Sequence, residues 1–268
     1  MCVPQRYGPG ARLRAPHTLP IALVALLAVA GCGESPTHSP KPGTSGVAVK
    51  GSSTYHIDLP TAEARPGTAV VVLVDTSGSM GQTVPDRSGK QRPKSEIARE
   101  ALEHIVSSTA DWKKSHPDRA LQLAVYNFSS DVREVLPMGD FDPAKAKAAL
   151  QKIPAPAGGT AIGRALEEGF KALYRSGRAR KFVVCVTDGE NTSGPQPDWV
   201  ARGLFAQTKG EVELQFVAFD TSASQFHFLK EVNGEVVQAA NGEQLQAELA
   251  KIYEQRILAE KEESPDKK

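Results

Sequence analysis

The sequence predicts an α/β protein with a doubly wound, mostly parallel sheet and helices on both faces. Residues 69–74 form an uninterrupted apolar, largely β-branched run, which is typical of a strand buried on both sides. Further apolar runs follow, and they alternate with segments of helical periodicity. Alternation of this kind favours a parallel sheet whose strands are joined by right-handed crossovers.

The helices are predicted from apolar residues spaced three or four positions apart. Ile97, Ala101 and Ile105 share one face of the first helix, and Leu166 and Phe170 share one face of a later helix. An Asp-Pro pair starts a short helix between them. The predicted helices cover residues 95–114, 142–153, 160–174, 198–208, 225–232 and 243–257.

The strands are predicted from short apolar runs that end at turn-forming residues. The run at residues 181–186 ends in Thr187-Asp188-Gly189, and residues 132–138 follow a Ser-Ser-Asp turn that lets them pair with a neighbour. Residues 54–59 alternate weakly between polar and apolar and are a candidate edge strand. The predicted strands cover residues 69–74, 120–128, 132–138, 181–186, 212–219 and 234–239.

Composition argues against a nucleic-acid partner. The 268 residues are 40% hydrophobic and 24% charged, with a formal net charge of +1. Three arginines lie in the first 31 residues, which hold no acid, so the remainder has 29 basic and 31 acidic residues, a net charge of −2. A chain without a basic excess has little means of neutralising phosphates.

The amino-terminal segment is expected to be an export signal. Arginines precede an apolar run at residues 19–30, which is too short to span a bilayer. The run ends in Val29-Ala30-Gly31-Cys32, which resembles the signal of bacterial lipoproteins. That resemblance implies cleavage before Cys32, followed by attachment of a lipid and acylation of the new amino terminus. An ordinary cleaved signal and a buried apolar helix are the alternatives.

A lipidated Cys32 would place the protein in a bacterial cell envelope. Because Gly33 rather than Asp follows the cysteine, the resemblance implies the outer rather than the inner membrane if the cell has two. Cys2 would leave with the signal and Cys185 stands in an apolar strand, so the mature chain has no pair for an intramolecular disulfide. Cys185 is expected to be inert core packing.

Four segments are expected along the chain. Residues 1–31 are the signal peptide, and residues 32–66 are the lipidated cysteine and a flexible tether rich in Pro, Gly and Ser. Residues 67–258 form the α/β domain, and residues 259–268 are a charged, solvated tail.

A polar loop directly after the first strand is the leading candidate site. Asp75, Ser77 and Ser79 bring one carboxylate and two hydroxyls to the carboxyl end of a buried strand, where ligands bind in open α/β sheets. Oxygen ligands suit a hard cation such as Mg²⁺. Taken alone, the motif equally fits a polar turn in which a serine caps a helix.

Two further segments place oxygen atoms at the same end of the sheet. Gly158-Gly159 allows close backbone approach, and Thr160 offers a hydroxyl at the start of a helix. Asp188 follows an apolar strand in the way that Asp75 does. If those two strands are neighbours, both carboxylates and all three hydroxyls converge on one crevice.

Together these residues resemble the metal-ion-dependent adhesion site (MIDAS) of von Willebrand factor A (VWA) domains, which have a Rossmann-like fold. The resemblance covers about residues 67–258 and matches Asp75-x-Ser77-x-Ser79, Thr160 and Asp188 in order and spacing. It implies one Mg²⁺, Mn²⁺ or Ca²⁺ ion bound directly by Ser77, Ser79 and often Thr160. Asp75 and Asp188 would act mostly through water. A carboxylate from a protein partner would complete the coordination, since an ion with neutral ligands attracts an anion.

Two other function classes remain open at this stage. A metal-dependent hydrolase would use the two acids and the ion to activate water, and a structural envelope lipoprotein would use the metal only to stabilise its fold. No catalytic constellation and no phosphate-binding loop appears, so neither an enzyme nor nucleotide binding is expected. Among the histidines only His227 lies at a plausible position, and a lone histidine is usually structural. The polar loop at residues 81–93 either helps to select the partner or is a disordered insertion.

Overall fold

A mixed six-stranded sheet forms the centre of the domain. The computed structural model describes residues 55–259, and the expectations for the signal, Cys32, the tether up to residue 54 and the tail from residue 260 lie outside them. The strand order is β5-β4-β1-β6-β7-β8; β5 is antiparallel to β4 and the other neighbouring pairs are parallel. The strands are β1 (Arg65–Asp75), β4 (Leu121–Phe128), β5 (Val132–Asp140), β6 (Arg178–Thr187), β7 (Val212–Phe219) and β8 (Gly234–Ala239).

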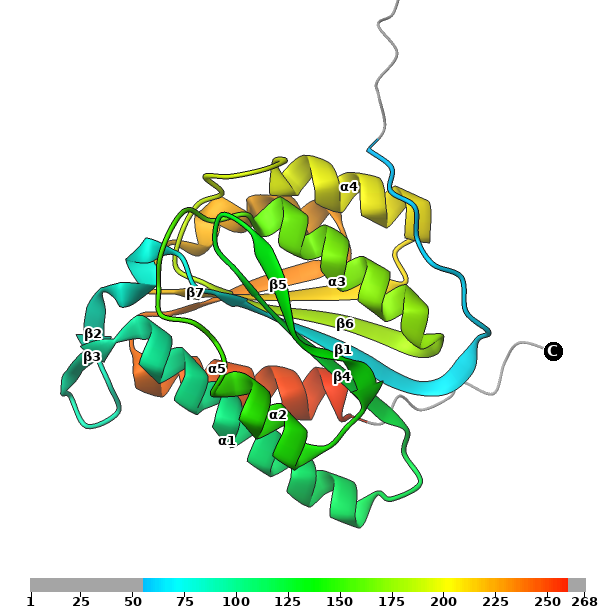
Figure 1. Ribbon diagram of the computed structural model, residues 1–268, viewed down its shortest axis with the longest axis horizontal. Helices are drawn as coiled ribbons and strands as arrows, with labels where there is room; N and C mark the ends of the chain where they lie inside the picture. The colour runs from blue at the N-terminus through cyan, green and yellow to red at the C-terminus, as the bar shows by residue number, and fades with distance from the viewer. Residues whose placement is uncertain (1–54, 260–268) are drawn as a thin grey trace, which may run out of the picture. The chain divides into compact units, whose positions relative to one another are not determined.

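Helices cover both faces of the sheet, with α1, α2 and α5 on one face and α3 and α4 on the other (Figure 1). A 3₁₀ segment, η2, joins α4 on its face, and the π-helical turn η3 continues α5. The helices are α1 (Lys94–Ser115), α2 (Pro143–Leu150), α3 (Ile162–Ser176), α4 (Pro197–Thr208), η2 (Ala223–Glu231), α5 (Gly242–Ile252) and η3 (Tyr253–Ile257). This arrangement confirms the predicted doubly wound α/β fold.

The apolar runs of the sequence supply both faces of the sheet at once. In β1, Val70 and Val72 pack in the cluster beneath α1, α2 and α5, whereas Val71 and Leu73 pack in the cluster beneath α3 and α4. Successive side chains of a strand point to opposite faces, so a strand covered on both sides needs apolar residues throughout. The central position of β1 therefore follows from its composition.

None of the helices in residues 55–259 has the length and apolar composition needed to cross a membrane.

The polar loop at residues 81–93 contains a small β-hairpin rather than the disordered insertion that was one alternative. Strands β2 (Thr83–Pro85) and β3 (Gln91–Pro93) pair in antiparallel fashion ahead of α1. Between them, Asp86 Oδ1 accepts hydrogen bonds from the backbone N–H groups of Ser88, at 2.8 Å, and Lys90, at 3.0 Å. These bonds give a polar segment a fixed turn.

The edge strand expected at residues 54–59 is wrong for the described part of that segment. Residues 55–59 have no strand assignment, yet Tyr55, Ile57 and Leu59 pack against the cluster beneath α3 and α4. The Gln207 side chain donates to the Ile57 carbonyl at 2.8 Å and accepts from the Ile57 N–H at 3.4 Å. A side-chain amide on α4 thus satisfies the backbone that a neighbouring strand would have satisfied.

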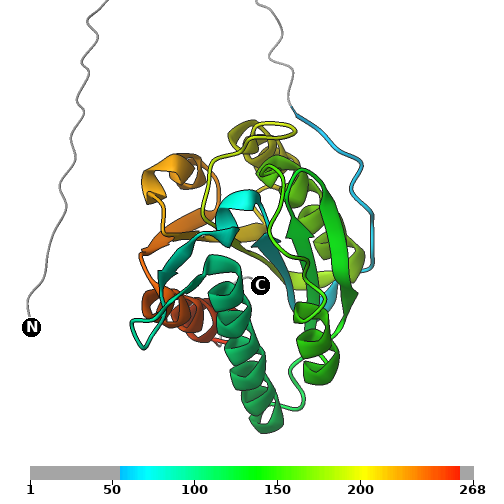
Figure 2. The same ribbon diagram turned by 60° about the vertical axis from the view of Figure 1, so that its left-hand side comes forward.

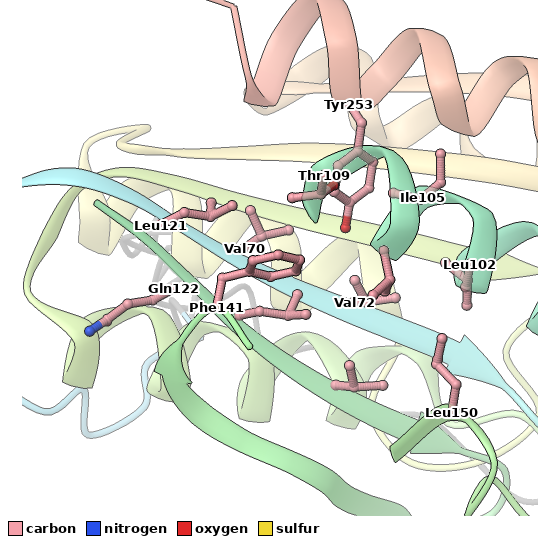
Figure 3. A pocket seen from close by; sticks show the side chains of 13 residues that line it. Val70, Val72, Leu102, Ile105, Thr109, Leu121, Gln122, Phe141, Leu150 and Tyr253 are labelled. Atoms are coloured by element: carbon pink, nitrogen blue, oxygen red, sulfur yellow. The ribbon is translucent and has the colours of Figure 1, made fainter. Parts of the chain in front are cut away.

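An apolar pocket lies between the sheet and α1, far along the strands from their carboxyl ends. Val70, Val72, Ile105, Phe141 and Tyr253 are among the side chains that line it (Figure 3). Its cavity volume of about 20 Å³ holds roughly one water molecule. A void of this size is a packing gap and does not admit an organic ligand.

Candidate functional site

The two strands that carry the predicted carboxylates are direct neighbours. Strand β1 pairs in parallel with β6, with Val74 opposite Val186, so both strands end at the same edge of the sheet. Asp75 is the last residue of β1, and Asp188 follows the last residue of β6. Figure 2 turns this edge toward the viewer, with the short 3₁₀ helix η1 (Gly78–Gly81) at its centre. The crevice expected from the sequence therefore lies at the carboxyl ends of adjacent parallel strands.

Asp75 is fully buried, and both of its carboxylate oxygens accept hydrogen bonds. Oδ1 accepts from the backbone N–H of Ser77 at 2.7 Å, and Oδ2 accepts from Thr187 Oγ1 at 2.6 Å. Burial raises the pKa of Asp75 to about 6, although the bonds from Thr187 and Ser77 lower it; the nearby charge of Asp188 adds a further rise. Asp75 thus holds the loop in place while retaining a poorly solvated charge.

A continuous hydrogen-bonded chain joins Ser77, Ser79 and Asp188. The hydroxyls of Ser77 and Ser79 lie 3.0 Å apart, and Ser79 Oγ donates to Asp188 Oδ1 at 2.7 Å. The Asp188 side chain has no exposed surface, whereas Ser79 is half-buried. Two hydroxyls from the segment after β1 and one carboxylate from the loop after β6 therefore meet at this edge of the sheet.

The glycine-rich segment before α3 contacts the first loop directly. Gly78 N donates to Gly158 O at 3.0 Å, and Ala157 N donates to Thr76 O at 2.9 Å. A Cβ atom on Gly159 would lie 2.6 Å from Ser193 Oγ, and Gly158 has a φ of +80°, so side chains are disfavoured at both positions. These glycines make room for the side chains of Ser130 and Ser193, and the two backbone hydrogen bonds hold the segment against the first loop.

Thr160 lies in the loop before α3 rather than inside the helix, which starts at Ile162. Its backbone N–H donates to Thr192 Oγ1 at 2.8 Å, and its carbonyl accepts from the backbone N–H of Thr192 at 2.9 Å. A Cβ atom on Gly189 would lie 3.8 Å from Ser79 Oγ and 3.9 Å from Thr160 Oγ1. The structure therefore brings the Thr160 and Ser79 hydroxyls to the same glycine, and the five predicted residues lie together at the carboxyl edge of the sheet.

A buried lysine that sequence reasoning missed completes the site. Lys94 Nζ donates to Asp188 Oδ2 at 3.0 Å, to Asp220 Oδ2 at 2.8 Å and to Gln82 Oε1 at 3.3 Å. Its side chain is 3% exposed. Burial lowers the pKa of Lys94, but the bonds to Asp220 and Asp188 outweigh that effect and the net direction is upward. Lys94 is therefore a charged ammonium within the crevice.

Comparison with known proteins identifies the domain. Residues 70–190 match the model of the von Willebrand factor type A domain. The chain contains a von Willebrand factor type A domain. No curated protein matches the chain.

Solved structures show the same fold for the VWA domain at low sequence identity. The PilB minor pilin from Streptococcus sanguinis superposes with a TM-score of 0.57 at 16% identity, over 76% of this chain and 64% of the pilin. A von Willebrand factor type A protein from Catenulispora acidiphila gives 0.55 at 22% identity, over 69% of this chain and 42% of that one. Proximal thread matrix protein 1 from the mussel byssus, with a zinc-occupied MIDAS motif, superposes with a TM-score of 0.53 at 19% identity. The match covers 73% of this chain and 46% of the mussel protein. This chain thus spans less than two thirds of each of these structures.

The side chains of the VWA crevice fit a hard divalent cation. The donors are hydroxyl and carboxylate oxygens from three loops, the type that Mg²⁺ and Mn²⁺ prefer. Within residues 55–259 no three His, Cys, Asp or Glu side chains gather as a metal-binding group, so an ion here would depend on the serine and threonine hydroxyls. The Ser77 and Ser79 hydroxyls bond to each other, and Ser79 also bonds to Asp188.

Neither His227 nor Cys185 supplies a reactive group to the site. His227 is exposed, and its Nδ1 contacts only Ser224 O, at 3.3 Å. In the described part of the chain no histidine bonds to the hydroxyls of Ser77 or Ser79. Cys185 is fully buried, and burial raises the pKa of its thiol, which leaves it unreactive.

Proposed function

We propose that this VWA domain binds one Mg²⁺ or Mn²⁺ ion and uses it to hold a carboxylate of a protein partner. Ser77, Ser79 and Thr160 would bind the ion through their hydroxyls, and Asp75 and Asp188 would hold it mostly through water. VWA domains commonly bind protein partners, which supports recognition as the task of the site. The bonded chain from Ser77 through Ser79 to Asp188 is the observation that carries the proposal, because it gathers two hydroxyls and one carboxylate, all oxygen ligands, at one position.

Recognition fits the contacts of the two acids better than catalysis does. Both oxygens of Asp75 accept hydrogen bonds from Ser77 and Thr187, and both oxygens of Asp188 accept from Ser79 and Lys94. A general base needs an oxygen that can take a proton from water at the reacting position. Carboxylates already bonded on both sides serve better as fixed supports of the ion, so we infer a binding module rather than a hydrolase.

A lipid on Cys32 would anchor the domain in a bacterial cell envelope, in the outer membrane if the cell has two. The support comes from the sequence alone, namely the basic segment, the apolar run and the small residues before the cysteine. Attached acyl chains would give a stable anchor. Metabolic labelling with a palmitate analogue tests this: the native chain should take up label and Cys32→Ala should not. Equal labelling of both would contradict the anchor.

A pull-down with the whole chain from an envelope extract tests the bridging mechanism. We expect a partner band in Mg²⁺ that is lost in EDTA and in Asp75→Ala. Asp131→Ala is the matched control, because it removes a carboxylate that is 78% exposed near the same edge of the sheet. Binding that survives both EDTA and Asp75→Ala would contradict the proposal. A metal-dependent hydrolytic activity lost in Asp75→Ala but kept in Asp131→Ala would favour the hydrolase alternative.

A further inference from the structure

Lys94 occupies a position that neither core packing nor helix stability explains. Lysine is almost never buried unless it is paired, yet the Lys94 side chain is 3% exposed. It is also the first residue of the 22-residue helix α1, where the helix dipole disfavours a positive charge. An ammonium placed against both tendencies has to be compensated by specific neighbours.

Three acceptors supply that compensation, one for each ammonium proton. They are Asp188 Oδ2 at 3.0 Å, Asp220 Oδ2 at 2.8 Å and Gln82 Oε1 at 3.3 Å. The Lys94 backbone N–H also donates to Gln82 O at 2.9 Å, which ties the start of α1 to the end of the first loop. The ammonium is therefore fully bonded and fixed in the crevice.

The position and backbone conformation of Asp220 bring its carboxylate to Lys94. It follows β7 at the same edge of the sheet and has a φ of +53°, a conformation that few residues other than glycine adopt. Its backbone N–H donates to Ala239 O at 2.7 Å, which fixes the strained turn. Its side chain is 43% exposed, so solvent screens its charge more than that of Asp188.

The two carboxylate oxygens of Asp188 bond to different neighbours, Lys94 and Ser79. Oδ2 faces the ammonium at 3.0 Å, which leaves Oδ1 for Ser79 Oγ at 2.7 Å. A carboxylate held at both oxygens has one orientation relative to the hydroxyl pair of Ser77 and Ser79. The lysine thus acts on the proposed metal position through Asp188.

We propose that Lys94 is a positioning residue that orients Asp188 and keeps a bound divalent cation incompletely neutralised, so that the site selects an anionic sixth ligand. This inference rests on the function proposed above. The negative charges of Asp75 and Asp188 balance a divalent ion, and the buried ammonium adds one positive charge to that set. The screened Asp220 offsets part of this charge. The lysine therefore weakens metal binding and strengthens the binding of a partner carboxylate to the metal-loaded site.

Two substitutions that change the local charge in opposite directions test the proposal. Lys94→Met removes the positive charge and retains a long unbranched side chain. Asp220→Asn removes the opposing negative charge and keeps a side chain that tolerates positive φ. Mn²⁺ affinity of the whole chain is measured by electron paramagnetic resonance. Acetate is then titrated into the Mn²⁺-loaded protein and followed by water-proton relaxation, with acetamide as the uncharged control. Thermal unfolding checks that each variant is folded.

In each variant the affinities for Mn²⁺ and for acetate should change in opposite directions, and each change should be reversed between the two variants. Lys94→Met should bind Mn²⁺ at least about tenfold more tightly than the native chain and acetate at least about threefold more weakly. Asp220→Asn should bind Mn²⁺ more weakly and acetate more tightly. Acetamide should not respond to either change.

A loss of Mn²⁺ and acetate affinity together in Lys94→Met would overturn the proposal and assign the lysine a purely structural role. An unchanged acetate affinity in a folded Asp220→Asn variant would also overturn it. A native chain that binds no Mn²⁺ would refute the metal-bridging function itself, and this inference with it. Failure of the inference alone is recognised by a native chain that binds Mn²⁺ and acetate while the variants show no opposed shifts.

Discussion

Asp75→Asn is expected to stabilise the metal-free protein while removing its metal binding. The amide that replaces the carboxylate would keep both hydrogen bonds: its carbonyl oxygen accepts from the Ser77 N–H, and its NH₂ group donates to Thr187 Oγ1, which is able to accept. Only the buried negative charge is lost. In the proposed function that charge supports the cation, whereas in metal-free protein its burial lowers stability.

The size of the effect follows from the pKa of Asp75. Burial raises that pKa from 3.8 to about 6, which corresponds to a linked free energy of about 3 kcal/mol at roughly 1.4 kcal/mol for each pH unit. Because the folded state holds the proton more tightly than the unfolded state, this contribution to stability is present below pH 3.8 and is lost as the pH rises through about 6. The stability gained by Asp75→Asn should therefore grow by about 2 to 3 kcal/mol between pH 4 and pH 8.

Urea unfolding of both proteins in EDTA at several pH values measures this difference. Every other titrating group is shared, so the difference between the two curves isolates Asp75. A variant that is less stable than the native chain at pH 8, or a difference that does not change with pH, would refute the reasoning. In saturating Mg²⁺ the native chain should regain stability and the variant should not.

Three further outcomes follow from the packing. Gly203→Ala should loosen the packing of residues 55–59, because a Cβ on Gly203 would lie 2.4 Å from Tyr55 O. Faster cleavage by Glu-C protease at Glu63 would show this loosening, and unchanged cleavage would argue against the contact. Phe170→Ala, at a residue of α3 that is 2% exposed, should reduce the free energy of unfolding by about 3 to 5 kcal/mol in urea titration; a loss below about 1 kcal/mol would contradict the core assignment. EDTA should leave the far-ultraviolet circular dichroism unchanged, since two apolar clusters carry the fold, and Mg²⁺ at one hundred times its Kd should add only about 2.7 kcal/mol; unfolding by EDTA alone would favour a structural metal.

The sheet and the relation between its two central strands were predictable from the sequence. The unbroken apolar runs that became β1 and β6 require burial on both faces, and an acid directly after each run points to the carboxyl edge of the sheet. The sequence left their adjacency as a condition; β1 and β6 are paired, which brings Asp75 and Asp188 to the same edge of the sheet. Local sequence was sufficient here because a run of consecutive apolar residues predicts a buried strand, and the polar residue that follows predicts its end.

Lys94 and its partner Asp220 were not predicted, because their place in the site depends on tertiary contacts. Lys94 follows a polar, proline-containing loop, where a lysine is normally solvated. It is buried here, and its ammonium bonds to groups from distant segments, Asp188 and Asp220. Asp220 carried a usable signal, since it follows the apolar run of β7 in the way that Asp75 follows β1. The expected strand at residues 54–59 failed for a similar reason: its alternation reflects packing on helices, and periodicity alone does not distinguish a helix surface from a strand edge.

A crystal structure of the whole chain grown with Mn²⁺, with anomalous diffraction measured for manganese, tests the central claim most directly. The account predicts one strong anomalous peak about 2.1 Å from the hydroxyl oxygens of Ser77 and Ser79, with Asp188 still bonded to Lys94. An acidic side chain from a neighbouring molecule or an acetate ion would complete the coordination. A peak located elsewhere on the domain, or no peak at millimolar Mn²⁺, would contradict the assignment of this crevice as a metal-dependent recognition site.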